Sequence, residues 1–184
     1  MCGIVGYLGS RDGRQIVIDG LRRLEYRGYD SAGIAVVAGG ELYTRKKAGK
    51  IANLAAAIEA NPLPESGTAI GHTRWATHGA PTDANSHPHM AGRIAIVHNG
   101  IIENHTVLRE DLDVEFASET DSEVAAQLLS REVAAGADLV SAMQAVVARL
   151  EGAFTLVSFY VRTDVVACMV GDYEIGRASC RERV

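Results

Sequence analysis

The sequence has few cysteines, and their spacing forms no recognisable framework. Only three occur among 184 residues, and they are Cys2, Cys168 and Cys180. They lie far apart and include no C-x-x-C pair, which argues against a disulfide scaffold and against a cysteine-based zinc site. The proportions of 47% hydrophobic and 22% charged residues are typical of one globular domain, so disorder is not expected to be the main state.

Features of nucleic-acid-binding, secreted and membrane proteins are also missing. No run of lysine and arginine occurs, and 23 acidic against 18 basic residues give a net charge of −5. Nucleic acid is therefore not an expected partner. The N-terminal region has no signal-peptide pattern, and no apolar run approaches the roughly 18–20 residues that span a bilayer. We therefore predict a cytoplasmic protein with no membrane partner.

The apolar patterns that are present predict an α+β fold. We expect strands at 2–8, 32–38, 41–47, 68–79, 93–100, 152–161 and 164–170, and helices at 12–28, 50–60, 121–135 and 138–150. Gly39-Gly40 suits a two-residue hairpin turn, because glycine adopts positive φ easily. The strand at 152–161 is largely apolar on both alternating faces, so both should be covered. Several hairpins with helices grouped between them favour a layered sandwich over a parallel sheet.

Cys2 stands directly behind the initiator methionine, which is an unusual place for a structural cysteine. Buried cysteines are commonly inert small hydrophobes. Removal of Met1, however, would leave a thiol and a free α-amine on the same residue. An α-amine with a pKa of about 7.7–8.0 can accept a thiol proton and later return it to a leaving amine. The position therefore favours a nucleophile.

Two further segments each have a structural and a functional interpretation. Asn99-Gly100 in "VHNG" is a strong turn signal, and spacing alone favours a turn, yet an asparagine amide and a glycine N–H could also form an oxyanion hole. Thr120 and Glu123 form a capping-box pattern, which would make Asp121 a first-turn carboxylate. Asp121 could equally bind a substrate ammonium group, and both roles are compatible.

The segment "HTRWATHG" and the histidines are equally ambiguous from the residues alone. Arg74 presents a fork suited to a carboxylate, although a solvated salt bridge is the commoner role for an arginine. All six histidines lie between positions 72 and 105, but their spacings match no common ligand pattern, so we expect no metal site.

Taken in order, the segments "CGIVGYLG", "LRRLEYRGYDSAG", "GHTRWATHG", "HPH", "VHNGIIENH" and "SETDSE" resemble a known family. They are similar to the glutamine-hydrolysing domain of class II glutamine amidotransferases, in the branch of the glutamine–fructose-6-phosphate aminotransferases. The resemblance runs from Cys2 to about Ala167. It implies the four-layer αββα sandwich of the N-terminal nucleophile hydrolases, with antiparallel sheets.

The resemblance also implies the chemistry of each motif residue. Cys2 would be the nucleophile, its own α-amine the base, and Asn99 with Gly100 the oxyanion hole. Arg74 would hold the α-carboxylate of L-glutamine, and Asp121 its α-ammonium. No cofactor is implied. The remaining residues that it places around the pocket or the nucleophile are Trp75, Thr77, His78 and Arg27.

The resemblance further predicts how the chain is divided. Residues 2–173 are expected to form an amidotransferase domain that is incomplete at its C-terminal end, without the sugar-phosphate isomerase domain that the longer family members carry in a homodimer. Residues 174–184, "EIGRASCRERV", resemble the translation of a sequencing-library adapter and are predicted to be non-biological. The alternatives to an active glutaminase are an inactive truncated fragment and an amino-acid-binding module of the same fold.

Overall fold

The structure is a computed structural model that describes residues 2–76, 79–161 and 166–170. Its first half comprises β1 (Gly3–Leu8), α1 (Gly13–Leu24), the 3-10 helix η1 (Glu25–Arg27), β2 (Ser31–Ala38), β3 (Glu41–Ala48), α2 (Ile51–Ala60) and β4 (Thr68–Arg74). The second half comprises β5 (His89–Ala91), β6 (Ile94–Gly100), α3 (His105–Glu110), α4 (Asp121–Ala134), α5 (Leu139–Val147), β7 (Phe154–Tyr160) and β8 (Val166–Val170).

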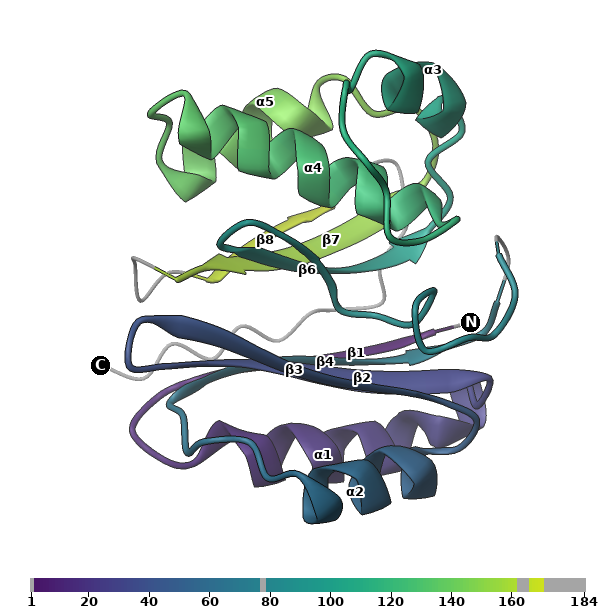
Figure 1. Ribbon diagram of the computed structural model, residues 1–184, viewed down its shortest axis with the longest axis vertical. Helices are drawn as coiled ribbons and strands as arrows, with labels where there is room; N and C mark the ends of the chain where they lie inside the picture. The colour runs from purple at the N-terminus through teal and green to yellow at the C-terminus, as the bar shows by residue number, and fades with distance from the viewer. Residues whose placement is uncertain (1, 77–78, 162–165, 171–184) are drawn as a thin grey trace.

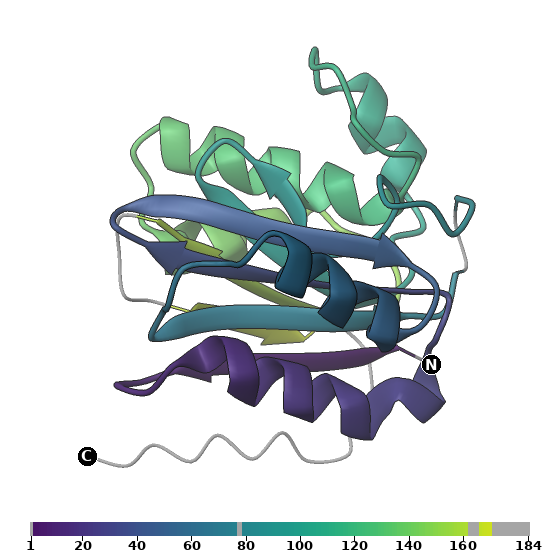
Figure 2. The same cartoon turned by 60° about the horizontal axis from the view of Figure 1, so that its bottom comes forward.

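The strands form two antiparallel sheets that lie face to face. The first sheet has the order β1-β4-β2-β3, and the second has the order β5-β6-β7-β8. Helices α1 and α2 cover the outer face of the first sheet, and α4 and α5 cover the outer face of the second (Figure 1). Figure 2 shows α1 and α2 crossing the first sheet from another side. The predicted α+β class and the αββα layering are confirmed.

Three apolar clusters hold these layers together, because both faces of the central strands carry apolar side chains. One cluster joins α1 and α2 to the first sheet through residues such as Val17 and Leu21. Another joins α4 and α5 to the second sheet and includes Leu156. The third lies between the sheets and includes Val97 and Phe159. Leu156 and Phe159 lie on opposite faces of β7, which confirms that both faces of this strand are covered.

Local sequence signals account for the β2–β3 hairpin and for the start of α4. Gly39 and Gly40 have φ angles of 59° and 78° and connect β2 to β3, as predicted for a hairpin. Thr120 caps α4 by accepting a hydrogen bond from the Glu123 N–H. The reciprocal half of the predicted capping box is not formed, because the Glu123 carboxylate accepts instead from the N–H groups of Ala117 and Ser118.

The structure corrects several predicted boundaries. The helix predicted at 12–28 ends at Leu24 and continues as η1, and the strand predicted at 68–79 ends at Arg74. Two short elements were not predicted. Strand β5 lies in the segment expected to be a loop, and α3 follows β6. Within the described part of the chain, no helix combines the length and apolar character needed to cross a membrane. Residues 174–184 lie outside the described residues, so the adapter interpretation stays a prediction.

Candidate active site

The site forms where the first strand begins beside the end of its neighbour. β1 pairs with β4 so that Gly3 lies opposite Thr73, and this register brings Cys2 next to the residues that follow β4. The Trp75 N–H donates to Cys2 Sγ at 3.2 Å, and Sγ lies 3.6 Å from the Trp75 carbonyl oxygen. The backbone of Trp75 therefore offers a hydrogen-bond donor to the Cys2 thiolate and a hydrogen-bond acceptor to the Cys2 thiol.

The surroundings of Cys2 favour the neutral thiol. Burial raises the pKa of the Cys2 thiol, while the Trp75 N–H and the positive charge of Arg74 act in the opposite direction. A desolvated thiolate is costly, so a thiol at this position needs a base to take its proton before it can act as a nucleophile.

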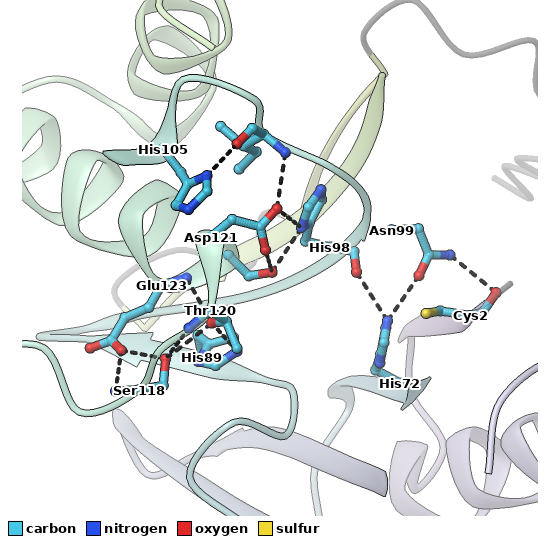
Figure 3. Close-up of polar contacts among 12 residues, drawn as sticks. Cys2, His72, His89, His98, Asn99, His105, Ser118, Thr120, Asp121 and Glu123 are labelled. Atoms are coloured by element: carbon cyan, nitrogen blue, oxygen red, sulfur yellow. Dashed lines mark hydrogen bonds and ion pairs between the residues drawn. The ribbon is translucent and has the colours of Figure 1, made fainter. Parts of the chain in front are cut away.

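Asn99 approaches Cys2 from the other sheet. Its Nδ2 donates to the Cys2 carbonyl oxygen at 3.3 Å, and its Oδ1 lies 2.8 Å from His72 Nε2 (Figure 3). Asn99 and Gly100 end β6 and pair with Thr155 and Phe154 of β7. The interpretation of Asn99-Gly100 as a turn, which spacing alone favoured, is therefore wrong.

Gly100 has a structural requirement of its own. Its φ is 125°, and a Cβ there would lie 2.1 Å from the Ala153 carbonyl oxygen. Any other residue would clash with this backbone and adopt a disfavoured conformation. Glycine is thus needed for the end of β6 to meet β7 as closely as it does.

Arg74 is enclosed rather than solvated. Its side chain is 4% exposed, and its two terminal nitrogens donate to the carbonyl oxygens of Gly79 and Ala80 at 3.1 and 3.3 Å. Burial lowers the pKa of Arg74, while negative charge on Cys2, Asp121 and Asp30 raises it. An arginine remains protonated in proteins, so Arg74 supplies a fixed positive charge beside Cys2. The commoner role, a solvated salt bridge, does not apply.

Asp121 is the first residue of α4 and is also 4% exposed. Its Oδ2 accepts from the Ile102 N–H at 2.9 Å and lies 3.9 Å from His98 Nδ1. The carboxylate thus joins the start of α4 to the segment after β6 (Figure 3). A carboxylate has about four acceptor positions, so these contacts leave acceptor capacity for a cation.

Trp75 and Arg27 are the other predicted residues that the structure describes, and Trp75 contacts Cys2 through its backbone alone. Trp75 is 45% exposed, and its ring meets that of Tyr29 edge-on at 5.4 Å. Arg27 ends η1 and is half-buried. The next residue, Gly28, lies so close to the β4 end that a Cβ there would be 2.8 Å from the Arg74 carbonyl carbon. Thr77 and His78 lie outside the described residues.

Sequence reasoning missed residues that hold the site in place. Asp30 binds the segment after β4 at two points, since its N–H donates to the Arg74 carbonyl oxygen and its carboxylate accepts from the Ala76 N–H. Asp30 lies in the segment "YRGYDSAG", whose residues carry no local signal for this role. The other missed residue is His72, which contacts Asn99.

Among the five histidines in the described ranges, four are buried: His72, His87, His89 and His98. The His87 ring centroid lies 4.1 Å from that of His72 and 4.7 Å from that of His89. Burial lowers the pKa of His72 to about 3 and lowers those of His87 and His89 well below the ordinary range. In the described ranges, no three His, Cys, Asp or Glu side chains are arranged to hold a metal ion.

Comparison with known proteins supplies independent information. A family described as "Glutamine amidotransferase domain" matches residues 72–172. Relatives named glutamine–fructose-6-phosphate aminotransferase [isomerizing] include one from Streptomyces coelicolor, 58% identical over 176 residues, and one from Leifsonia xyli, 57% identical over 166 residues. The matches cover 93% and 87% of this chain but 28% and 27% of the relatives. The chain therefore spans less than a third of their length.

Solved structures share the fold. The glutamine phosphoribosylpyrophosphate amidotransferase of B. subtilis has a TM-score of 0.74 at 27% identity, and the aligned region covers 88% of this chain and 35% of the B. subtilis chain. A glutamine aminotransferase class-II domain protein from Silicibacter pomeroyi has a TM-score of 0.56 at 21% identity, and the aligned region covers 87% of this chain and 76% of that protein. The second likeness concerns the fold alone.

Proposed function

Because this chain belongs to the glutamine amidotransferase domain family, we propose that it hydrolyses L-glutamine to glutamate and ammonia through a thioester on Cys2. Its αββα sandwich is that of the N-terminal nucleophile hydrolases. One observation carries the proposal. The amide nitrogen of Asn99, on the second sheet, lies 3.3 Å from the carbonyl oxygen of Cys2, beside the first sheet. A nucleophile and an oxyanion donor from distant segments thus meet at one point.

The proposed reaction begins with proton transfer from the Cys2 thiol to its own α-amine after removal of Met1. The raised pKa of the thiol makes such a base necessary. Sulfur then bonds to the amide carbon of glutamine, and the negative charge moves to the amide oxygen. The Asn99 amide and the Gly100 N–H stabilise this oxyanion. The C–N bond breaks as the α-ammonium returns its proton, and ammonia leaves. Water then cleaves the thioester, which releases glutamate and restores the thiol.

The two charges of free glutamine suit two buried charges, that of Arg74 beside Cys2 and that of Asp121, which acts electrostatically on Arg74. We propose that Arg74 binds the α-carboxylate and Asp121 the α-ammonium, while Trp75, Thr77 and His78 line the pocket. Arg27 is proposed to support the surroundings of Cys2. The fixed positive charge of Arg74 and the acceptor capacity of Asp121 support this assignment.

The longer relatives suggest where the ammonia goes. Their name, glutamine–fructose-6-phosphate aminotransferase [isomerizing], specifies fructose 6-phosphate as the acceptor and an isomerising activity. We propose that the ammonia is used to aminate fructose 6-phosphate in a longer, homodimeric protein with a sugar-phosphate isomerase domain. A cytoplasmic location and the domain at 2–173 stay predictions.

Incubation of the purified 184-residue chain with glutamine tests the proposal. Equal amounts of glutamate and ammonia should form, and the intact mass should confirm that Met1 has been removed. Glutamine binding without turnover, by a chain of the correct mass, would favour the amino-acid-binding module and contradict the enzyme.

Arg74→Lys is expected to raise KM for glutamine roughly 10- to 100-fold, because a point ammonium cannot replace two parallel charge-assisted hydrogen bonds. Lysine also cannot donate to Gly79 and Ala80 in the same geometry. Steady-state kinetics measure the effect. Arg22→Lys is the matched control, since the Arg22 side chain is exposed on the outer side of α1 and pairs with Asp19. An unchanged KM would leave Arg74 only a role in holding the loop.

Asp121→Asn is expected to raise KM for glutamine roughly 10- to 100-fold through loss of the charged partner of the ammonium. An asparagine oxygen can still accept from the Ile102 N–H, so the junction with α4 is retained. The same variant should hardly affect hydrolysis of a glutamine analogue that lacks the α-amine. An equal penalty with both substrates would contradict the assignment and leave Asp121 a purely structural role.

A further inference from the structure

The side-chain amide of Asn99, the proposed oxyanion donor, can lie in two opposite orientations, and the protein must select one of them. A terminal amide carries a donor nitrogen on one side and an acceptor oxygen on the other. Only one of the two orientations of Asn99 directs its NH₂ group toward Cys2. In the structure, Nδ2 points to the Cys2 carbonyl oxygen, and Oδ1 points to His72 (Figure 3).

The contacts of His72 determine which of its ring nitrogens carries the proton. His72 Nε2 lies 3.0 Å from the His98 carbonyl oxygen and 2.8 Å from Asn99 Oδ1. A carbonyl oxygen can only accept, so Nε2 must be the protonated nitrogen. His72 Nδ1 is buried and has no hydrogen-bond partner among the described residues, which fits an unprotonated nitrogen. The ring is 1% exposed, and burial holds its pKa near 3, so it is neutral at physiological pH.

We propose that His72 is a positioning residue that fixes the orientation of the Asn99 amide, so that its NH₂ group faces the oxyanion that forms beside Cys2. This inference rests on the proposed function. If the amide were reversed, its NH₂ group would face the Nε2–H of His72 and its oxygen would face the Cys2 carbonyl oxygen. Both contacts would be repulsive, so His72 excludes the unproductive orientation.

The position of His72 in the fold makes this arrangement rigid. His72 lies on β4 of the first sheet, and Asn99 ends β6 of the second. Ile70, two residues before His72 on the same face of β4, packs in the apolar cluster between the sheets with Val97, two residues before Asn99. The hydrogen bond therefore joins the two sheets at the edge of their shared core. One donor holds both the backbone of His98 and the side chain of Asn99.

Two variants that differ only in reach test the role of His72. A glutamine side chain places its amide nitrogen near the position of histidine Nε2, whereas an asparagine side chain reaches only the position of Nδ1. His72→Asn should lower kcat for glutamine hydrolysis roughly 10- to 100-fold with KM nearly unchanged. His72→Gln should recover most of that loss. Equal kinetics for the two variants would overturn the proposal.

Coupling with Asn99 gives a second readout that a merely structural histidine would not produce. If His72 acts through Asn99, the double variant His72→Asn/Asn99→Ala should be no slower than Asn99→Ala alone. Independent, multiplicative losses would overturn the proposal. The thermal unfolding of each variant is compared with that of the wild type. If His72→Asn does not fold, His72→Leu, which also lacks the donor, takes its place in both comparisons.

Ligand binding separates this inference from the proposed function. A glutamine analogue with an aldehyde in place of the amide would form an adduct with Cys2 whose oxygen occupies the oxyanion position, whereas glutamate would not. His72→Asn should weaken binding of the aldehyde at least roughly tenfold and leave glutamate binding unchanged. Equal effects on both ligands would overturn the inference. Absence of turnover by the wild type would instead overturn the proposed function, and the inference with it.

Discussion

Cys2→Ala is expected to abolish glutamine hydrolysis while leaving the protein folded. The variant removes the only atom that forms the thioester, and loss of the nucleophile in comparable enzymes costs on the order of 10⁴-fold or more in kcat. The change deletes one half-buried sulfur atom whose contacts are with the backbone of Trp75. Release of glutamate and ammonia measures activity, and thermal unfolding measures the fold.

The control for this prediction is Cys168→Ala. Cys168 lies opposite Val157 in the pairing of β8 with β7, and the proposed reaction gives it no role. That variant should retain the wild-type rate. A chloroketone analogue of glutamine should alkylate Cys2. The intact mass of the wild type and of Cys168→Ala should therefore increase by one attached molecule, and that of Cys2→Ala should not. Turnover by folded Cys2→Ala would contradict the thioester mechanism.

Elements with a strong local signal were predicted well from the sequence. The Gly39-Gly40 pair fixed the hairpin between β2 and β3, because few other residues adopt two successive positive φ angles. The long α4 was found from its apolar periodicity and its Thr120 cap. In each case the physical cause lies within a few residues of the chain, so no tertiary contact was needed to identify it.

The elements that were missed depend on contacts made after folding. Strand β5 has three residues and is a strand only because β6 offers it an edge to pair with. Helix α3 has six residues and follows Asn104, whose side chain makes no capping hydrogen bond. Glu123 was expected to complete a capping box, but its carboxylate binds the backbone of the preceding loop instead. Such short elements and competing acceptors are decided by tertiary structure.

In the candidate site, too, local motifs were recognised from the sequence, whereas contacts between distant segments were not. Motif resemblance supplied Cys2, Asn99 and Arg74. The structure brings Asn99 of β6 into contact with Cys2, and it places the charge of Arg74, at the end of β4, where it acts on the Cys2 thiol. His72 was considered only as a metal ligand. Its alternation with Ile70 and Arg74 placed the three side chains on one face of a strand. The sequence could not indicate that this face meets Asn99, because that contact depends on how two sheets are stacked.

Asn99→Ala is expected to lower kcat by roughly 10²–10³-fold with a smaller change in KM, because it removes one oxyanion donor whose contribution is largest in the transition state. The loss should exceed that of His72→Asn, which retains the amide and only releases its orientation. Asn53→Ala is the matched control, since Asn53 lies on α2 and its side chain donates to the Ala48 carbonyl oxygen. Steady-state kinetics with glutamine separate kcat from KM. A raised KM with unchanged kcat would make Asn99 a substrate-binding residue, and the oxyanion would then need another donor near Cys2.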